Sequence, residues 1–253
     1  MSTKAEAVLI LTPMKNTSGH LDTYFRGLSS LTYPHTKLSL GILEGDSADD
    51  TYVRTNERLA GLDFHRTAIF KKDFNFRIPP GVPRWTDALQ PTRRSVLARA
   101  RNHLLFRALD DEDWVLWLDA DVIAYPPDII ERLLAVGGKI VHPHCVIEPG
   151  GRTFDLNAWR DGGKQTMQDL RGQGRTRLDA VGGTMLLVNA DCHRDGLIFP
   201  PFFYGNRNAS IRDPHPLGRG ILGEIETEGL GIMAQDMRID CWGVPDLEIF
   251  HAC

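Results

Sequence analysis

The stretch WVLWLDADV, residues 114–122, joins an apolar run to two aspartates. A short continuous apolar run is typical of a strand that is buried on both faces, as in a parallel sheet. Asp119 and Asp121 follow the run at positions i and i+2. They would share one face of a continuing strand, and they would converge on one point in a turn just past it. The stretch therefore predicts a buried strand that brings two carboxylates to one end of a sheet.

Strand and helix patterns alternate on both sides of this stretch. The segment VLILTP is an apolar run that stops at a proline, and LSLGILEGDSADD is another that ends in an acidic loop. Between them, residues 20–31 carry apolar side chains at helical spacing. Strand, helix and strand in this order form a βαβ unit. We expect an α/β fold with an open, mostly parallel twisted sheet flanked by helices, in one domain over residues 1–253. In such sheets, ligands bind at the carboxyl ends of the strands.

The remaining elements follow from the same patterns. Helices are expected at residues 20–31, 49–60, 93–109, 126–136 and 227–239. Strands are expected at residues 8–13, from 38 onward, and at 64–70, 114–122, 139–145, 180–191 and 241–251. Residues 71–92 and 200–224 read as loops. Residues 148–178 are rich in Gly, Arg, Gln and Asp with poor periodicity, which predicts a long loop or a partly ordered insertion.

Composition narrows the class of protein. Hydrophobic residues make up 42% and charged residues 25% of the chain, as in a soluble globular protein with a sizeable core. The net charge of −4 argues against a nucleic-acid partner. Four scattered cysteines without a CxxC pair disfavour a zinc cluster or a disulfide framework and favour a reducing compartment. No apolar run reaches transmembrane length. We expect a cytoplasmic protein; peripheral membrane association and oligomerisation stay open.

The two carboxylates suggest a metal site. Held close together they repel each other, unless a cation lies between them. Oxygen ligands suit Mn²⁺ or Mg²⁺, which also bind phosphate oxygens. With a metal at the strand ends, His251 on the last strand becomes a further candidate ligand. The alternatives are that the aspartates cap the next helix or lie in a solvated turn, and that His251 is a surface histidine. Capping fits poorly because residues 122–125 separate the aspartates from that helix.

Several blocks occur together in one order along the chain. They are TPMKN, EGDSADD, RRSVLARARNHLL, WVLWLDADVIAYPPDII, FDLNAW, VGGTMLLVNADCHRDGLIFP, TEGLGIMAQDM and GVPDLEIFH. This series resembles the Anp1/Mnn9/Van1 family of α-mannosyltransferases, known from fungal Golgi glycan synthesis, and more broadly glycosyltransferases with the GT-A fold. The likeness runs from Val8 to His251. It implies a GDP-mannose donor, a divalent ion that is usually Mn²⁺, a glycan acceptor, and retention of configuration at the anomeric carbon.

The resemblance also implies roles for particular residues. Asp121 and Asp119 would be the metal-binding pair, with Asp121 the more direct ligand, and His251 the C-terminal metal ligand. Arg99 and Asn102 would belong to the donor site. The implied nucleotide-sugar site comprises Thr12, Pro13, Lys15, Glu44, Asp46, Arg99, Asn102 and Asp119. Residues 1–125 would form a nucleotide-binding half and residues 126–253 an acceptor-side half. The fungal proteins carry a membrane anchor that does not occur in this sequence, and the acceptor cannot be carried over from them.

Transfer of a sugar from a nucleotide requires stabilisation of the leaving diphosphate. Arg99 is the first candidate for this positive charge, and Arg93 or Lys15 are alternatives for which a solvated surface role is equally open. Attack from the front face could retain configuration without a protein base. Glu228 is the remaining catalytic candidate; it would bind sugar hydroxyls or orient the acceptor, or else serve as favourable charge in a first helical turn.

Two glycines and two rival functions complete the expectations. Gly182 and Gly183 would let the backbone approach the donor sugar, although a bulge would also explain them. A catalytically silent subunit that binds a nucleotide sugar or a glycan is the main alternative function. A sugar-phosphate nucleotidyltransferase is a weaker alternative, because TPMKNTSG lacks the dense glycines of its signature loop.

Overall fold

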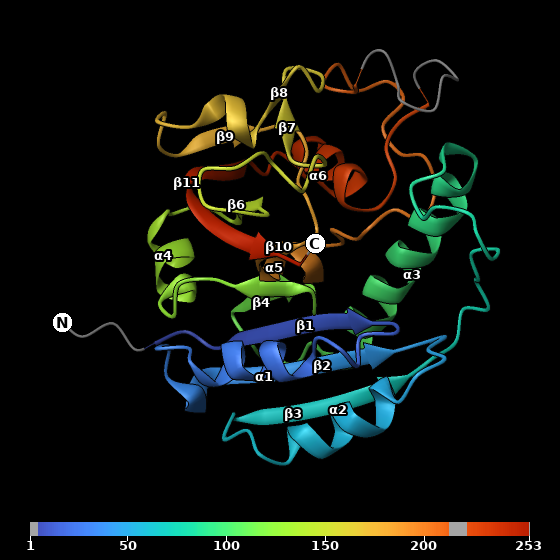
Figure 1. The fold of residues 1–253 in the computed structure, drawn as a ribbon. Coiled ribbons are helices and arrows are strands. Elements are labelled where there is room, and N and C mark those ends of the chain that lie inside the picture. Colours follow the sequence, from blue (N-terminus) through green and yellow to red (C-terminus); the bar gives the residue numbers. More distant parts are fainter. Residues whose placement is uncertain (1–4, 213–221, 253) are drawn as a thin grey trace.

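The structure is a computed structural model that describes residues 5–212 and 222–252. Its centre is a nine-stranded sheet in the order β3-β2-β1-β4-β10-β6-β11-β5, with β9 paired to β11 (Figure 1). The strands of this sheet are β1 (Val8–Met14), β2 (Leu38–Glu44), β3 (Arg66–Lys71), β4 (Trp114–Leu118), β5 (Val122–Ala124), β6 (Ile140–Val146), β9 (Thr176–Leu178), β10 (Met185–Asn189) and β11 (Cys241–His251). The helices are α1 (Leu21–Ser29), α2 (Thr51–Leu59), α3 (Gln90–Ala108), α4 (Ile129–Ala135), α5 (Ala190–Arg194) and α6 (Glu226–Asp236), with 3-10 turns at His35–Lys37, Asp87–Leu89 and Met167–Leu170.

The predicted α/β class is confirmed, and the strand directions add detail to it. Strands β3, β2, β1 and β4 are all parallel, as the βαβ pattern predicts. Strand β10 runs antiparallel to both β4 and β6, whereas β6 and β11 are parallel. The sheet is therefore mixed, and its parallel N-terminal part ends at β4. The division into halves at residue 125 stays a prediction.

The stretch WVLWLDADV is two strands rather than one. Strand β4 ends at Leu118, and the Val122 amide donates a hydrogen bond to the Asp119 carbonyl at 3.2 Å, which closes a tight turn. Strand β5 then pairs antiparallel with β11, opposite His251. The prediction of one strand over residues 114–122 is wrong at its end. The turn places Asp121 beside His251, the last residue of β11.

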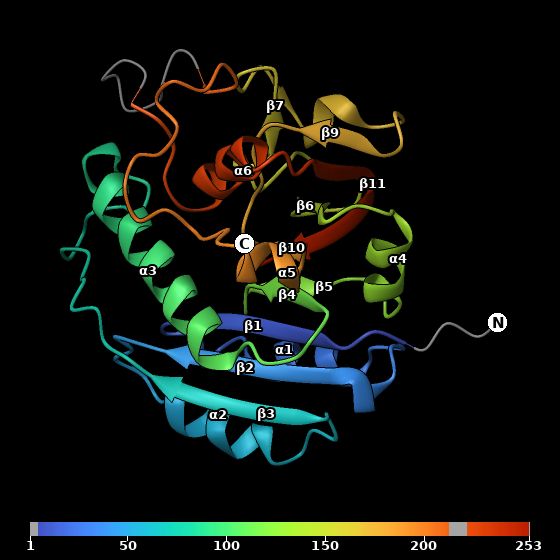
Figure 2. The ribbon, with the colours of Figure 1, turned by 180° about the vertical axis from the view of Figure 1, so that it is seen from behind.

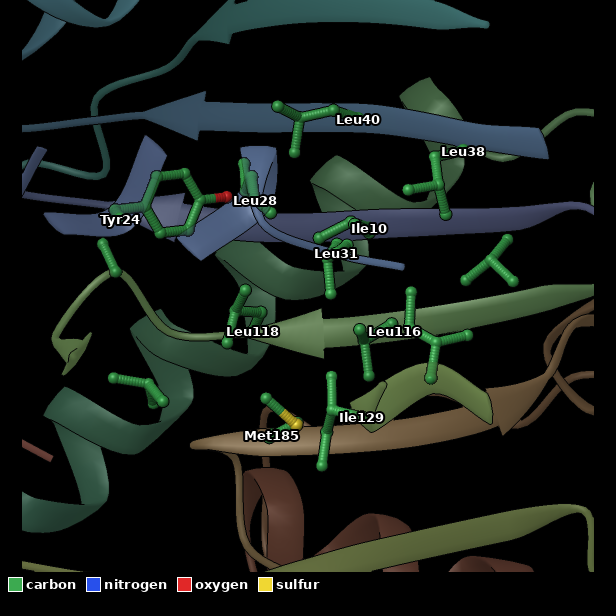
Figure 3. Packing of buried hydrophobic residues seen from close by; sticks show 14 of the residues in the cluster. Ile10, Tyr24, Leu28, Leu31, Leu38, Leu40, Leu116, Leu118, Ile129 and Met185 are labelled. Carbon is green, nitrogen blue, oxygen red and sulfur yellow. The ribbon is translucent and has the colours of Figure 1, made fainter. Parts of the chain in front are cut away.

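Apolar side chains alternate across β1 and separate two cores, one on each side of the sheet. Val8 and Ile10 face the core under α1 and α4, and Leu9 and Leu11 face the core under α3 and α6. Figure 3 shows Ile10 among the leucines of β2 and β4, close to Leu28 of α1. Figures 1 and 2 show α1 and α3 on opposite faces. Each such buried side chain contributes about 1.5–3 kcal/mol, so the strand ends that carry polar residues are held in place.

Residues 148–178 are more ordered than the sequence predicts. They contain the ribbon of β7 (Trp159–Arg160) and β8 (Gln165–Thr166), a 3-10 turn, and strand β9. Trp159, Met167 and Leu178 are buried, but their spacing matches neither helix nor strand periodicity. The loop at 200–224 is confirmed for residues 200–212 and 222–224; the rest lies outside the described residues.

Three further features of the fold concern the start of α3, the cysteines and the apolarity of the helices. Helix α3 begins at Gln90, three residues before the predicted start, because Pro91 is well suited to a first helical turn. Cys145, Cys192 and Cys241 are buried and free. Within the described part of the chain, no helix combines the length and apolarity needed to cross a membrane.

Candidate active site

Two pockets meet at the carboxyl end of β4. The N-terminal pocket, of about 660 Å³, lies at the ends of β1 and β2 and is closed by residues 74–78. The C-terminal pocket, of about 400 Å³, lies between residues 154–157 and α6. Their shared wall consists of Arg84, Arg93, Leu97, Arg101, Asp119 and Asp121. The sheet thus delivers both aspartates to the boundary between two cavities.

Asp121 faces the end of β11. His251 Nε2 lies 3.2 Å from Asp121 Oδ1, and the His251 ring stacks on Phe154 with centroids 3.7 Å apart. Burial opposes ionisation of Asp121, but the hydrogen bond and charge of His251 outweigh it and lower the pKa of Asp121. Burial also disfavours the charged form of His251, but the hydrogen bond and charge of Asp121 outweigh burial and raise the pKa of His251. The two side chains therefore form an ion pair.

The same pair fits a divalent ion. His251 Nδ1 donates to the Ala252 carbonyl, which leaves Nε2 as the nitrogen directed at Asp121. A backbone acceptor that orients an imidazole in this way is the usual support of a metal-binding histidine. Among the residues that the structure describes, no group of three or more His, Cys, Asp or Glu side chains is arranged to hold a metal. The protein thus offers an oxygen and a nitrogen ligand, and a bound ion would complete its coordination with substrate oxygens or water.

Asp119 faces α3 and is held by an arginine. Arg101, which is buried, donates from Nη2 to Asp119 Oδ1 at 3.0 Å and from Nε to Glu226 Oε1 at 2.9 Å. Burial raises the pKa of Asp119 to about 7; the charge of Arg101 opposes this rise, and that of Asp121 adds to it. Glu226 has a φ of 60°, a conformation that costs a non-glycine residue free energy. The Arg101 bridge therefore ties the first turn of α6 to the end of β4.

The two glycines before β10 make room for side chains. A Cβ at Gly182 would lie 2.0 Å from Asp155 Oδ2, and one at Gly183 would lie 2.6 Å from Arg101 Nη2. Asp155 Oδ2 accepts hydrogen bonds from the Gly183 amide at 2.9 Å and the Thr184 amide at 3.2 Å. The glycines leave space that Asp155 and Arg101 occupy, and the predicted approach to a donor sugar stays a prediction. Gly183 lines the C-terminal pocket, and Gly182 lies behind it.

Asp155 is a site residue that the sequence analysis did not single out. Burial opposes the ionisation of Asp155. His142, and the backbone amides that donate hydrogen bonds to Asp155, nevertheless hold the pKa of Asp155 well below its usual range. His142 Nε2 lies 3.8 Å from Asp155 Oδ2. Asp155 is the only carboxylate in the block FDLNAW, one of the blocks that resemble the family, and this was the one feature of the sequence that pointed to it.

Glu228 lines the C-terminal pocket, and neighbouring side chains already bind its carboxylate oxygens. It accepts from Trp159 Nε1 at 2.6 Å and pairs with Arg94 Nη1 at 2.5 Å and with Arg212. The side chain is 1% exposed. Nearby, burial and the charge of Glu228 raise the pKa of Glu224 to about 8. Glu228 is therefore brought to the site, but its oxygens are already bonded.

Besides Asp119, three of the predicted nucleotide-site residues line the N-terminal pocket. Pro13, Lys15 and Asp46 all border it. Lys15 Nζ donates to the Phe76 carbonyl at 2.6 Å. Asp46 accepts from the amides of Phe74 and Asn75, each at 3.0 Å. These residues position the segment that carries two aromatic rings of the pocket wall.

Besides Gly182, four predicted residues line neither pocket. Thr12 is buried against the Tyr24 hydroxyl at 2.6 Å, and Glu44 accepts the Ser47 amide at 3.0 Å. Asn102 Nδ2 donates to the Phe199 carbonyl at 2.7 Å, and Asn102 Oδ1 accepts from the Phe199 amide at 2.9 Å. Arg99 is exposed and lies over the Phe74 ring. None of these four side chains borders a cavity directly, although Glu44 and Arg99 contact Ser47 and Phe74, which line the N-terminal pocket.

Helical phase explains where the arginines of α3 go. Arg93, Leu97 and Arg101 are four residues apart and share one face, whereas Arg99 lies about 200° around the helix from Leu97. Arg93 borders both pockets, and burial lowers its pKa. Within the described residues Arg93 makes no salt bridge, unlike Arg94 and Arg101. Arg93 is therefore a cation whose charge is not already paired.

The charge balance of the two pockets differs. Among the described residues, the N-terminal pocket is lined by five lysine and arginine side chains and three carboxylates. The C-terminal pocket is lined by five arginines and seven carboxylates. The first environment suits an anion, and the second suits a neutral or cationic group.

Comparisons with known proteins agree with this fold. In a comparison of solved structures, a mannosyltransferase from Pyrobaculum calidifontis, in complex with GDP-Man and Mn²⁺, superposes with a TM-score of 0.61 at 15% identity, covering 99% of this chain and 58% of that one. GalNAc-T7 with UDP, GalNAc and Mn²⁺ gives a TM-score of 0.57 at 12% identity, covering 97% and 44%. At such identities the likeness shows the fold alone. It is the GT-A fold of glycosyltransferases, as the sequence predicts.

Sequence relatives extend the match. The mannan polymerase complex subunit MNN9 of Candida albicans is 30% identical over 98% of this chain and 75% of its own length. The mannan polymerase II complex ANP1 subunit of Saccharomyces cerevisiae is 28% identical over 98% of this chain. The chain spans 55% of that yeast protein's length. The family model described as Anp1 matches residues 1–174, so the chain belongs to the Anp1 family.

Proposed function

We propose that the chain is a metal-dependent retaining glycosyltransferase that moves a hexose, mannose from GDP-mannose, onto a glycan or another hydroxyl acceptor. The observation that carries the proposal is the Asp121–His251 pair, next to Asp119, at the wall shared by two pockets of different charge balance. The names of the fungal relatives, and the GDP-Man and Mn²⁺ bound by the archaeal structure of the same fold, support mannosyl transfer.

The nucleotide is assigned to the N-terminal pocket. Phe74 and Phe76 offer aromatic surface for a base, and Lys15 and Arg77 add positive charge. A diphosphate linked to that base would reach the shared wall, where Asp119 and Asp121 lie. The hexose would then project into the C-terminal pocket. This arrangement follows the general rule that ligands lie at the carboxyl ends of the strands.

Asp121 and His251 would hold Mn²⁺, or Mg²⁺, with Asp119 as the second carboxylate of the pair. When bound, the ion acts as a Lewis acid for the leaving diphosphate. His251 is oriented for this role by its contacts with the Ala252 carbonyl and the Phe154 ring. Asp119 is oriented by Arg101, whose guanidinium is already shared with Glu226.

Arg93 would stabilise the negative charge that develops on the leaving group. Its charge is unpaired within the described residues, and it borders both cavities at the wall that contains the aspartates. Preorganised positive charge in a partly dry site is commonly the largest single contribution to catalysis. Glu228 would shape the pocket and fix Arg94, because Trp159, Arg94 and Arg212 already occupy its oxygens. With front-face attack, the leaving diphosphate would take the proton of the acceptor hydroxyl, so transfer requires no protein base.

The deciding experiment measures GDP release from GDP-mannose with a panel of mannosides, in Mn²⁺ and in excess EDTA. Turnover that requires both Mn²⁺ and a mannoside supports the proposal, and equal turnover in EDTA contradicts it. GDP-mannose binding without turnover on any acceptor would favour the silent subunit, a role that the relatives' naming as complex subunits also fits. Membership in a multi-subunit assembly is proposed on the same naming. The cytoplasmic location stays a prediction.

A further inference from the structure

An exposed tryptophan stands at the mouth of the C-terminal pocket. Trp85 is 74% exposed and lines the pocket from the segment between β3 and α3. Large aromatic side chains are usually well buried, because each removes a large apolar area from water. An exposed one beside a polar cavity is therefore a candidate ligand contact.

The backbone around Trp85 is fixed. The Thr86 amide and hydroxyl donate to the Pro83 carbonyl at 3.1 and 2.8 Å. Gln90 Nε2, in the first turn of α3, donates to the Arg84 carbonyl at 2.6 Å. These bonds on both sides of Trp85 hold the turn against the start of α3. The indole is thus presented to solvent from an anchored turn.

A second exposed apolar residue and an amide also line the pocket. Leu156 also lines the pocket and is 60% exposed. Next to it, the Asn157 side chain lines the pocket and makes no hydrogen bond within the described residues. The pocket therefore combines two exposed apolar side chains with an amide that makes no hydrogen bond within the described residues. A pyranose has the matching chemistry, because its C–H face is apolar and its edge carries hydroxyl groups.

The pocket's charge argues for a neutral ligand. Its seven carboxylates outnumber its five arginines among the described residues. Arg94, Arg101 and Arg212 are paired with carboxylates. Away from the shared wall, a phosphorylated or carboxylated sugar would find no unpaired cation among the described lining residues, whereas hydroxyl groups can bind carboxylates and amides alike.

We propose that Trp85, at the C-terminal pocket and beyond the space assigned to the donor hexose, stacks on a neutral pyranose of the acceptor glycan, with Asn157 bonding its hydroxyls. This inference rests on the proposed glycosyl transfer and adds the acceptor's chemical class and the residues that select it. Trp85 would determine acceptor affinity without touching the nucleotide, because it lines the C-terminal pocket alone.

The test compares Trp85→Ala and Trp85→Phe with Phe106→Ala as a matched control. Phe106 is 69% exposed and lines neither pocket. With mannotriose as acceptor, Trp85→Ala should raise the acceptor KM about tenfold, as expected for the loss of one aromatic stacking contact. Trp85→Phe should raise it less than threefold, since a ring remains, and Phe106→Ala should match the wild type. Equal acceptor KM in all four proteins would overturn the inference.

Two binding measurements separate this inference from the proposed function. In calorimetry with Mn²⁺, Trp85→Ala should bind GDP within twofold of the wild type, and a larger loss would assign Trp85 to the donor and overturn the inference. Mannotriose should change the tryptophan fluorescence of the wild type with GDP and Mn²⁺ bound, and should not do so in Trp85→Phe. If no turnover is found, the fluorescence change still tests the subsite. Tighter binding of mannose 6-phosphate than of mannose would contradict the neutral ligand.

Discussion

The two pockets share one wall but differ in the charge balance of their lining residues. In the N-terminal pocket, cations outnumber carboxylates, and Arg93 remains unpaired within the described residues. In the C-terminal pocket, carboxylates outnumber cations, and buried pairs such as Arg94–Glu228 occupy most of the charge. Free charge is useful where a charged group must bind, and paired charge is useful where a rigid polar wall is needed. The difference matches the proposed placement of a diphosphate on one side and a neutral sugar on the other.

The two aspartates of the shared wall carry the same contrast. Asp121 pairs with His251, a partner that a metal ion can replace. Asp119 pairs with Arg101, which is itself buried and bonded to Glu226. Asp121 is thus the adaptable carboxylate, and Asp119 is the fixed one. Variants of the wall can test this assignment.

The largest effect is expected for Asp121→Asn. The amide cannot replace a carboxylate as an anionic metal ligand, so Mn²⁺-dependent transfer should fall roughly a thousandfold, which is several kcal/mol of transition-state stabilisation. Steady-state kinetics with GDP-mannose measures it. Asp111→Asn is the matched control, because Asp111 is exposed and precedes β4 at its other end. Full activity of the Asp121 variant would remove the metal assignment.

The second effect distinguishes two arginines of α3. Arg93→Gln should lower kcat about a hundredfold, the typical loss when one preorganised charge on a leaving group is removed. Arg99→Gln should stay within about twofold of the wild type, because Arg99 is exposed and lines neither pocket. Parallel kcat and KM measurements decide between them. The reverse order would support the role implied by the family resemblance and contradict the assignment made from the structure.

These arginines show how much of the candidate site can be predicted from the sequence. Periodicity identified α3, but a choice among Arg93, Arg99 and Arg101 needs the direction in which the helix faces, which the sheet determines. The turn at Asp119 and the partnership with His251 were within reach, because strand ends of an α/β sheet gather at one edge. Asp155 was not, since its partners Gly183 and Thr184 lie far along the chain. Long-range pairings of irregular segments leave little local pattern.

A smaller effect, on stability, is expected for Asp155→Asn. The carboxylate accepts amide hydrogen bonds from Gly183 and Thr184, and charge-assisted bonds of this kind are worth about 1.5–3 kcal/mol. Thermal unfolding at pH 7 should therefore occur roughly 4–8 °C lower. A lowered pKa in the folded state contributes stability above the unfolded value, near 3.9, and loses it as the pH falls through the folded value. The gap between variant and wild type should accordingly narrow below about pH 4, and a constant gap would contradict this account.

The smallest effect concerns the pH dependence of metal binding. Burial raises the pKa of Asp119 to about 7, and the pair with Asp121 raises the pKa of His251. Metal ligands must lose their protons first, so protons compete with Mn²⁺ at this wall. Mn²⁺ affinity should rise roughly tenfold per pH unit up to about pH 7 and level off above it.

Calorimetry with Mn²⁺ at pH 6, 7 and 8 measures this slope directly. Asp119→Asn removes the carboxyl that titrates near pH 7 and keeps Asp121 and His251, so the variant should bind Mn²⁺ more weakly and with a shallower slope. An unchanged slope in the variant would mean that the proton is held by the His251–Asp121 pair alone. In that case the ion would bind without Asp119, whose carboxylate would serve only to fix Arg101 between the two pockets.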